Sequence, residues 1–204
     1  SAMLESDPAV ESVEIGGPYG VEGPGETPSR ERVFVCRPTG PSDEATCAAT
    51  ILSTLARRAY RRPVTEADIE TLLDFYNARP GASFDARIQF GLQMILADPE
   101  FLYRVEYDPP DLPDGTVYRI SDLELASRLS FFLWSSIPDD ELLDVATRGE
   151  LSDPAVLRKQ VRRMLADARS RALVENFTDQ WLVLRNIKDV EPDPNLLPEF
   201  DENL

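Results

Sequence analysis

Helical periodicity runs from Ser42 to Leu184, and it constrains the fold more than any other feature of the sequence. The first repeat places apolar residues three or four positions apart, which puts them on one face of a helix. Its members are Ala48, Ile51, Leu52, Leu55 and Ala59. Similar repeats follow, most of them preceded by a residue that can cap a helix. We therefore predict a mainly α fold of about eight helices in a bundle-like arrangement.

Cap and break signals divide this helical part into segments. Thr65 with Asp68, and Ser121 with Glu124, have the spacing of a capping box, in which two side chains satisfy each other's backbone N–H groups. Prolines and glycines predict the helix ends. The expected helices run from Ser42 or Asp43 to before Pro63, from Thr65 to before Pro80, from Ser83 to before Asp98, from Pro99 to Glu106, from Ser121 through Leu133, from Asp139 or Asp140 to Thr147, from Pro154 through Leu165, and from Ala172 through Leu184.

The first part of the chain has a different character. Gly and Pro are dense there, and two short stretches resemble strands. The stretch from Val10 to Ile15 alternates in polarity, and Arg32 to Cys36 is a compact apolar run. We expect a short two-stranded N-terminal β arm, either a small hairpin or an arm laid over the helices. An isolated two-stranded ribbon is only marginally stable, so this arm must pack on something.

A polar loop from Tyr107 to Thr116, which contains three prolines, separates two helical halves. We expect a β-like arm over residues 4–41, a first helical half over 42–107 and a second over 116–204, and the whole is also consistent with one continuous domain. Ser1-Ala2-Met3 is typical of a cloning remnant, and the end of the chain resembles the start of another helix. We therefore expect the chain to be part of a longer protein.

Histidine is absent from all 204 residues, which excludes a large part of ordinary enzyme chemistry. Without histidine there is no Ser–His or Cys–His nucleophile pair, no imidazole base near neutral pH, and no imidazole ligand for zinc or haem. We predict no catalytic residue, no metal site and no cofactor in this chain, and we do not expect the chain itself to be an enzyme.

The net charge of −16 argues against nucleic acid as a partner, because a polyanion would be repelled. No apolar run approaches the roughly 18 residues that a membrane-spanning helix needs. The richest stretch, Leu123 to Ile137, contains Glu124 and Arg128 and is typical of a buried helix. We expect neither nucleic-acid binding nor a membrane span.

The two cysteines, Cys36 and Cys47, are close in the sequence. A disulfide between them would tie the end of the predicted arm to the first helix, and closing so short a loop contributes about 3 kcal/mol in the chain-entropy model. Such a bond suits an oxidising compartment. The alternative is a pair of reduced thiols. The spacing does not match a redox C-x-x-C motif or a zinc knuckle.

Four arginines lie within six residues of this acidic chain: Arg57, Arg58, Arg61 and Arg62. On a helix they fall within one arc, because residues four apart share a face. A concentrated guanidinium patch can bind a carboxylate or phosphate, so these residues are a candidate contact for an anion or a partner. The structural interpretation is that they neutralise carboxylates of neighbouring helices and the C-terminal end of their own helix.

Three further patterns have both a functional and a structural interpretation. Asp108, Asp111 and Asp114 could offer oxygen ligands to calcium, but their spacing is not that of an EF-hand, and the neighbouring prolines favour a plain connector.

Paired carboxylates could hydrolyse glycosides without histidine, yet acids this abundant are typical of solvated helix faces. Those acids are Asp139, Asp140, Glu141, Asp144, Glu175 and Asp179. An aromatic strip could bind a ligand, although its spacing favours packing in the core. Its members are Phe131, Phe132, Trp134, Phe177 and Trp181.

Several strings carry a resemblance to a known family. They are LARRAYRRPVT at residues 55–65, DPEFLYR at 98–104 and YRISDLELASRLSFFLWSS at 118–136, with RMLAD at 163–167 and the Asn176-Phe177 and Gln180-Trp181-Leu182 pieces beyond them. Over about residues 10–204 the chain resembles the middle domains, of unknown function, of large planctomycete-type exported proteins that also carry c-type cytochrome modules. The resemblance implies export to the periplasm or beyond and haem c in flanking modules. This chain has no C-x-x-C-H motif, so no haem site is carried over to it.

These observations lead to one functional hypothesis and one alternative. The leading hypothesis is a non-catalytic helical scaffold or docking domain that supports electron transfer or oxidative chemistry on flanking cytochrome c-type modules. The alternative is a cleft-forming part of an oxidoreductase or carbohydrate-active protein, in which the arginine patch holds an anionic group. A carbohydrate is then a candidate partner.

Overall fold

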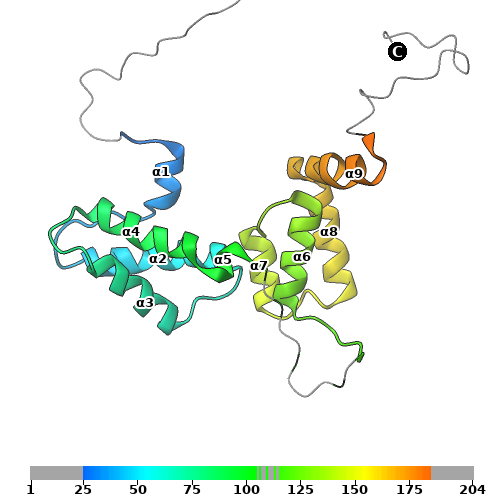
Figure 1. Cartoon of the computed structure of the whole chain (residues 1–204), viewed down its shortest axis with the longest axis horizontal. Helices are drawn as coiled ribbons and strands as arrows, with labels where there is room; N and C mark the ends of the chain where they lie inside the picture. The colour runs from blue at the N-terminus through cyan, green and yellow to red at the C-terminus, as the bar shows by residue number, and fades with distance from the viewer. Residues whose placement is uncertain (1–24, 105, 107–108, 110–112, 114, 185–204) are drawn as a thin grey trace, which may run out of the picture. The chain divides into compact units, whose positions relative to one another are not determined.

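The computed structural model describes residues 25–104, 106, 109, 113 and 115–184 (Figure 1). These residues belong to two compact units, which divide between Val35 and Cys36. In the first unit the described helix is α1 (Pro28–Val33). The Oγ of Thr27 accepts from the N–H of Arg30 at 3.2 Å, and Pro28 is the first helical residue. Proline suits this position because the N–H that it lacks would have had no helical partner.

The strand predicted over Arg32–Cys36 is wrong. Arg32 and Val33 end helix α1, and the residues that follow have no regular structure. The cap and the proline start a helix, while three apolar residues without a neighbouring strand cannot sustain a ladder. Phe34 instead packs against α1, with the Arg30 guanidinium 4.5 Å from its ring centroid. The other predicted strand, Val10–Ile15, lies outside the described residues. Within the described ranges all regular structure is helical, so the mainly α prediction is confirmed.

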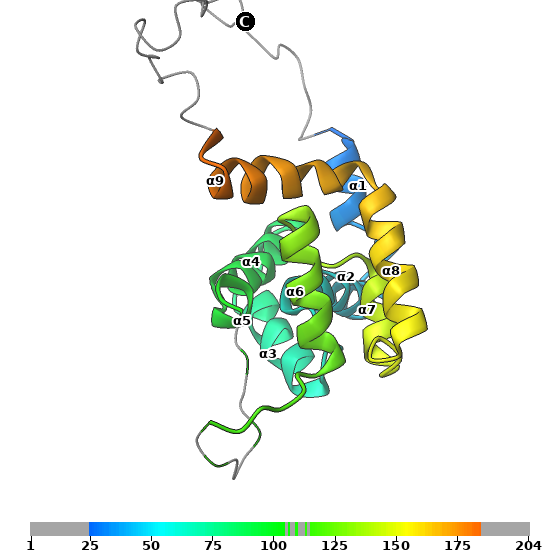
Figure 2. The same ribbon diagram turned by 90° about the vertical axis from the view of Figure 1, so that its right-hand side faces the viewer.

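The second unit begins with four helices, α2 (Glu44–Tyr60), α3 (Glu66–Asn77), α4 (Phe84–Ala97) and the short α5 (Pro99–Leu102). Helices α2, α3 and α4 pack against one another (Figures 1 and 2). Their apolar faces bury Ala48, Ile51, Leu52, Ala56, Leu72, Ile88 and Ile95. Gly91 allows α2 and α4 to approach closely, because a Cβ at this position would lie 2.7 Å from the Cδ2 of Leu52.

A polar cluster joins the same three helices at one end. The Glu44 carboxylate of α2 accepts hydrogen bonds from the Tyr76 hydroxyl of α3 and from the Arg87 guanidinium of α4. The Arg87 guanidinium also lies 3.8 Å from the centroid of the Tyr76 ring. Burial, together with the hydrogen bond to Glu44, raises the pKa of Tyr76 above its usual value. The tyrosine therefore stays a neutral donor at neutral pH.

The later part of this unit contains α6 (Asp122–Trp134), α7 (Asp140–Thr147), α8 (Pro154–Ala166) and the 3₁₀ turn η1 (Ala168–Ser170). Helix α6 contacts α7, α8 and η1. The core cluster here consists of Ala126, Leu133, Trp134, Leu142, Val145, Ala146, Leu151 and Met164. The Trp134 indole N–H donates to the carbonyl oxygen of Met164 at 2.9 Å, so the polar atom of this buried ring is satisfied.

The predicted caps are confirmed for most helices. Both capping boxes form, Thr65 with Asp68 and Ser121 with Glu124. Three further side chains accept from the first turn of their helices: Ser83 for α4, Asp139 for α7 and Asp153 for α8.

Asp43 does not cap its helix through its side chain. Its carboxylate accepts instead from the preceding loop, from the N–H and hydroxyl of Thr39 and from the N–H of Gly40. These hydrogen bonds, led by the Thr39 N–H, lower the pKa of Asp43 to about 2. The side chain therefore holds the loop that leads into α2.

Two helices differ in extent from the prediction. Helix α5 ends at Leu102, not at Glu106, and Tyr103 has extended backbone angles. The long helix expected from Ala172 to Leu184 is a π-helix, η2 (Leu173–Thr178), followed by α9 (Asp179–Trp181). A π turn is wider than an α turn and shifts the residues after it around the axis, which spacing alone does not reveal.

Among the described residues, none of the helices combines the length and the apolar character that a membrane span requires.

The predicted disulfide is present. Cys36 and Cys47 are bonded, with their Cα atoms 5.6 Å apart, and Cys47 is buried in the first turn of α2. The bond closes a loop that includes Thr39, Gly40 and Asp43, so the cross-link and the Asp43 hydrogen bonds restrain the same segment.

We expect replacement of both cysteines, Cys36→Ser with Cys47→Ser, to lower the free energy of unfolding by about 3 kcal/mol, because the unfolded chain regains the freedom of the loop. Urea denaturation checks this. Reductant should lower the midpoint of the wild type and leave that of the double variant unchanged. Equal midpoints for the oxidised wild type and the double variant would contradict it.

Candidate functional site

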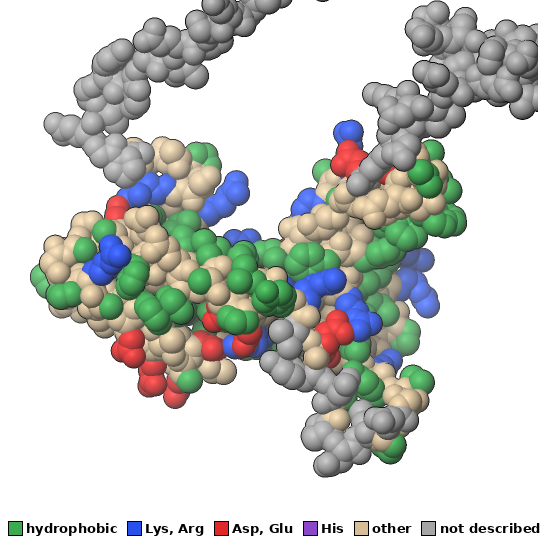
Figure 3. All heavy atoms as spheres, in the orientation of Figure 1, with side chains coloured by type: hydrophobic (Ala, Val, Ile, Leu, Met, Phe, Trp, Pro, Cys, Tyr) green, Lys and Arg blue, Asp and Glu red, His purple; other side chains and the backbone are tan. Residues whose placement is uncertain are grey.

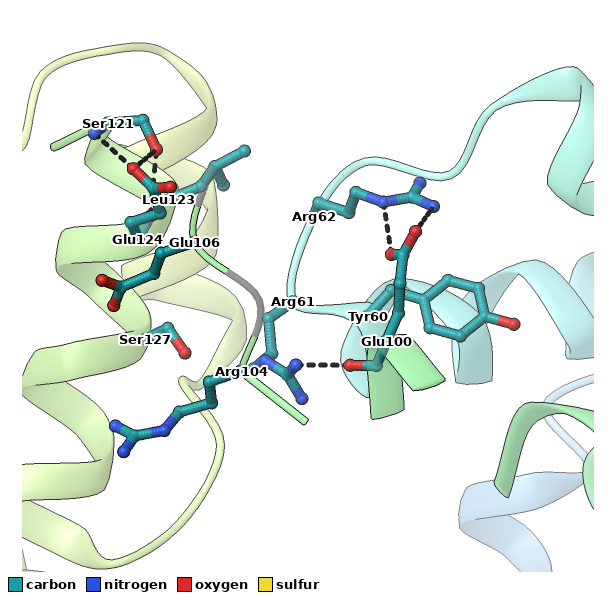
Figure 4. Close-up of a pocket in the computed structure, with 10 residues that line it drawn as sticks. All are labelled: Tyr60, Arg61, Arg62, Glu100, Arg104, Glu106, Ser121, Leu123, Glu124 and Ser127. Atoms are coloured by element: carbon teal, nitrogen blue, oxygen red, sulfur yellow. Dashed lines mark hydrogen bonds and ion pairs between the residues drawn. The ribbon is translucent and has the colours of Figure 1, made fainter. Parts of the chain in front are cut away.

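One hollow in the described part of the chain is lined by the end of α2, by α5 and the residues after it, and by the first two turns of α6 (Figure 4). Its volume is about 250 Å³. Two residues of the predicted arginine patch, Arg61 and Arg62, lie in its wall. The hollow is therefore the candidate site for binding of an anion.

Arg62 lies between two carboxylates. Its Nε and Nη2 donate to Glu100 at 2.8 and 2.9 Å, and its Nη1 and Nη2 donate to Asp68 at 2.7 and 3.1 Å. The hydrogen bonds from Arg62 hold the pKa of Asp68 well below its usual value, and those to Asp68 and Glu100 raise the pKa of Arg62. Two bidentate pairs on one guanidinium fix the end of α2 against the starts of α3 and α5.

The side chain of Arg61 binds backbone carbonyl oxygens. It ends α2 in the left-handed conformation, with φ at 58°, and it is only 8% exposed. Its guanidinium donates to the carbonyl oxygens of Ala59, Glu100 and Tyr103. Burial lowers the pKa of Arg61 from its usual value, although the group remains charged at neutral pH. Arg61 thus caps the ends of two helices, and its bonds to Glu100 and Tyr103 explain why α5 stops early.

Arg57 and Arg58 lie on the part of α2 that approaches α7. Arg57 donates to Asp140 at 3.0 Å and to Asp144 at 2.6 Å, and the Nε of Arg58 lies 3.9 Å from the same Asp140 oxygen. Arg58 also lines a second, more open hollow of about 420 Å³. The four arginines therefore divide between two places. Binding of an anion or partner by these residues stays a prediction.

Arg104, Glu106 and Ser127 also line the hollow, and the sequence did not indicate any of them as a site residue. Figure 4 shows the Arg104 side chain reaching toward α6, on the side where Glu106 and Ser127 lie. Glu106 accepts a bidentate pair from Arg128, which lowers its pKa, and Arg104 adds a smaller effect. The DPEFLYR string contains Arg104, but no periodicity signal could place this residue, because the helix before it ends early.

Most of the surrounding charges are paired. Figure 3 shows acidic side chains gathered over α3, with acidic and basic side chains next to each other near the segment between α5 and α6. Of the six acids considered for glycoside hydrolysis, Asp139 and Glu141 contact Arg163, and Glu175 contacts Arg171. The described residues hold no group of three or more Cys, Asp and Glu side chains that could bind a metal. Asp108, Asp111 and Asp114 lie outside them.

The aromatic strip divides into a buried and an exposed part. Trp134 is 3% exposed and stacks under Arg169, which is 3.5 Å from its ring centroid. Phe131 is partly buried beneath Arg104. By contrast, Phe132, Phe177 and Trp181 are exposed, and Phe177 contacts each of the other two rings. Because Phe177 stacks on Trp181, these two rings do not form a single flat platform of the kind that binds a sugar face.

We expect Asp68→Asn to lower the free energy of unfolding by about 1–2 kcal/mol at pH 7, because it weakens both the Arg62 pair and the capping box. The folded-state pKa of Asp68 is depressed, so its contribution is complete above the unfolded value of 3.8 and is lost as the pH falls below it. Urea denaturation at pH 7, 4 and 3 should show the two proteins converging. Asp74→Asn, at an exposed acid of the same helix, is the control, and a difference independent of pH would refute the assignment.

Comparison with known proteins identifies two regions of the chain. Residues 47–106 match PSD5, described as a protein of unknown function (DUF1595), and residues 120–204 match PSD4, described as a protein of unknown function (DUF1592). No curated protein and no solved structure matches the chain. Both families are typical of planctomycete-type cytochrome-associated proteins, so the resemblance is confirmed: the chain carries a PSD5 domain followed by a PSD4 domain.

Proposed function

We propose that this chain is a non-catalytic helical scaffold or docking domain of an exported multidomain protein, in which cytochrome c-type modules carry electron transfer or oxidative chemistry. The observation that carries the proposal is the use of the arginine patch. Arg57 contacts carboxylates of α7, Arg61 binds backbone carbonyl oxygens, and Arg62 binds Asp68 and Glu100. These charged groups hold helices together.

Contacts between the two matched regions support the same function. Arg57 lies in the PSD5 region and contacts Asp140 and Asp144 of the PSD4 region. Glu106 of the first region likewise binds Arg128 of the second. Each exposed pair contributes little to stability, but several pairs together favour one arrangement. A fixed arrangement is what a domain needs in order to position its neighbours.

The disulfide supports export, because such bonds persist in oxidising compartments and are rare in the cytosol. We infer a periplasmic or other exported location. Haem c belongs in this proposal to the flanking modules, since the chain contains no histidine and no C-x-x-C-H motif.

A second candidate function is a cleft-forming part of an oxidoreductase or carbohydrate-active protein. The hollow beside Arg61 and Arg62 favours it, because small-molecule sites are usually concave and hold polar groups that fix the orientation of the ligand. In that case the arginine patch would hold an anionic group of the substrate.

The double variant Arg58→Ala with Arg62→Ala, made in the longer protein, separates the two candidates. A scaffold predicts a lower melting temperature, mainly through loss of the two Arg62 carboxylate pairs, and unchanged binding of an anionic saccharide such as polygalacturonate. Calorimetry measures both. The control is Arg158→Ala with Arg162→Ala, two exposed arginines with the same spacing on α8, which should change neither.

Two results would contradict the scaffold function. One is loss of polygalacturonate binding by the Arg58/Arg62 variant at an unchanged melting temperature. The other is appreciable turnover of a model glycan, ester or peroxide by the chain alone.

A further inference from the structure

We propose that the hollow between α2, α5 and α6 binds a small organic acid with a single carboxylate, held by Arg104 and Ser127. Neither residue belongs to the arginine patch. The inference does not depend on the scaffold function, because a domain without catalysis can still bind a ligand.

The first observation concerns the polar partners of the Arg104 guanidinium. Within the described residues its guanidinium makes no hydrogen bond or ion pair, and it lies over the Phe131 ring, 5.0 Å from the centroid. Arg61 and Arg62 in the same wall are occupied by carbonyl oxygens and carboxylates. A guanidinium with free N–H groups, backed by an aromatic ring, can receive a carboxylate in a bidentate pair.

The second observation is the hydroxyl of Ser127 in α6. Its Oγ is buried, and none of the described residues donates to it or accepts from it. A buried polar atom without a partner costs free energy, so such atoms are rare in folded proteins and often mark a functional position. Ser127 lines the hollow on the side that Arg104 reaches (Figure 4). A carboxylate bound to Arg104 would supply its missing partner.

The charges of the wall determine the charge of the ligand. Arg62 is shared by Glu100 and Asp68, and Glu106 is paired with Arg128. Arg61 is bound to carbonyl oxygens, and the Glu124 carboxylate accepts from the N–H and hydroxyl of Ser121. Arg104 is therefore the guanidinium of the wall that can receive an added carboxylate, and one guanidinium suits a monocarboxylate better than a dianion. A hydroxyl on the ligand could bond to the carboxylate of Glu124.

The size and the lining of the hollow indicate the size and the apolar part of the ligand. Leu123 and the ring of Tyr60 give the hollow apolar surface between its charged groups. Its volume of about 250 Å³ lies below the roughly 300–1,000 Å³ of pockets for drug-sized molecules. The hollow therefore fits a compact hydroxy acid with a small apolar body.

Mandelate tests the proposal, because it has a carboxylate, a hydroxyl and an apolar ring, and its uncharged counterpart mandelamide is the matched probe. We expect calorimetry on the whole chain to show mandelate binding at least tenfold tighter than mandelamide. Arg104→Ala should weaken mandelate binding at least tenfold, since charge-assisted hydrogen bonds are the strong ones. Arg158→Ala, at an exposed arginine of α8, should bind like the wild type.

Ser127→Ala distinguishes a ligand contact from a structural role. The variant should melt no lower than the wild type, because it removes a buried hydroxyl without a partner, and it should bind mandelate at least threefold more weakly. Four results would overturn the proposal: no mandelate binding at millimolar concentration, equal affinity for mandelamide, unchanged affinity in Arg104→Ala, or a lower melting temperature for Ser127→Ala with unchanged affinity.

Discussion

The Arg62 guanidinium is the interaction on which the arrangement of α2, α3 and α5 depends. Its two partners also serve the helices that carry them: Asp68 closes the capping box of α3, and Glu100 lies in the first turn of α5. A carboxylate at a helix N-terminus is stabilised by the free N–H groups and the helix dipole, and here the same charge also meets a guanidinium. Both carboxylates bind the same guanidinium, so loss of Arg62 would leave them close together without a cation.

Arg61 supplements this interaction at the cost of backbone strain. A residue other than glycine in the left-handed conformation costs about 1–3 kcal/mol, and glycine is the usual choice at the end of a helix. The arginine side chain offsets this cost by binding three carbonyl oxygens that the helix ends would otherwise leave without partners. Glycine at this position would relieve the strain, but it could not reach Glu100 and Tyr103. The arginine therefore sets both the end of α2 and the path of the chain after α5.

The parts of this structure that the sequence predicts are those controlled by neighbours in the chain. Thr65 with Asp68 and Ser121 with Glu124 are capping boxes in both the sequence and the structure, because both partners lie within one turn. The partners of Arg57 and Arg62 could not be predicted, since Asp140 and Glu100 are distant in sequence and many other acids were available. The strand expected at Arg32–Cys36 failed for a related reason. Strand pairing needs a partner segment, whereas Thr27 and Pro28 start a helix locally.

The residues of the hollow also could not be predicted from their neighbours in the sequence. Ser127 occupies an ordinary position of a well-predicted helix, and Arg104 follows a helix that ends early, so neither stands out in the sequence. Arg104 belongs to the region that matches PSD5 and Ser127 to the region that matches PSD4, and both line the hollow. A ligand in this hollow would contact both regions, and by mass action it would stabilise the arrangement in which they meet. Binding there and the positioning of neighbouring modules are therefore compatible functions: the first would reinforce the contacts on which the second relies.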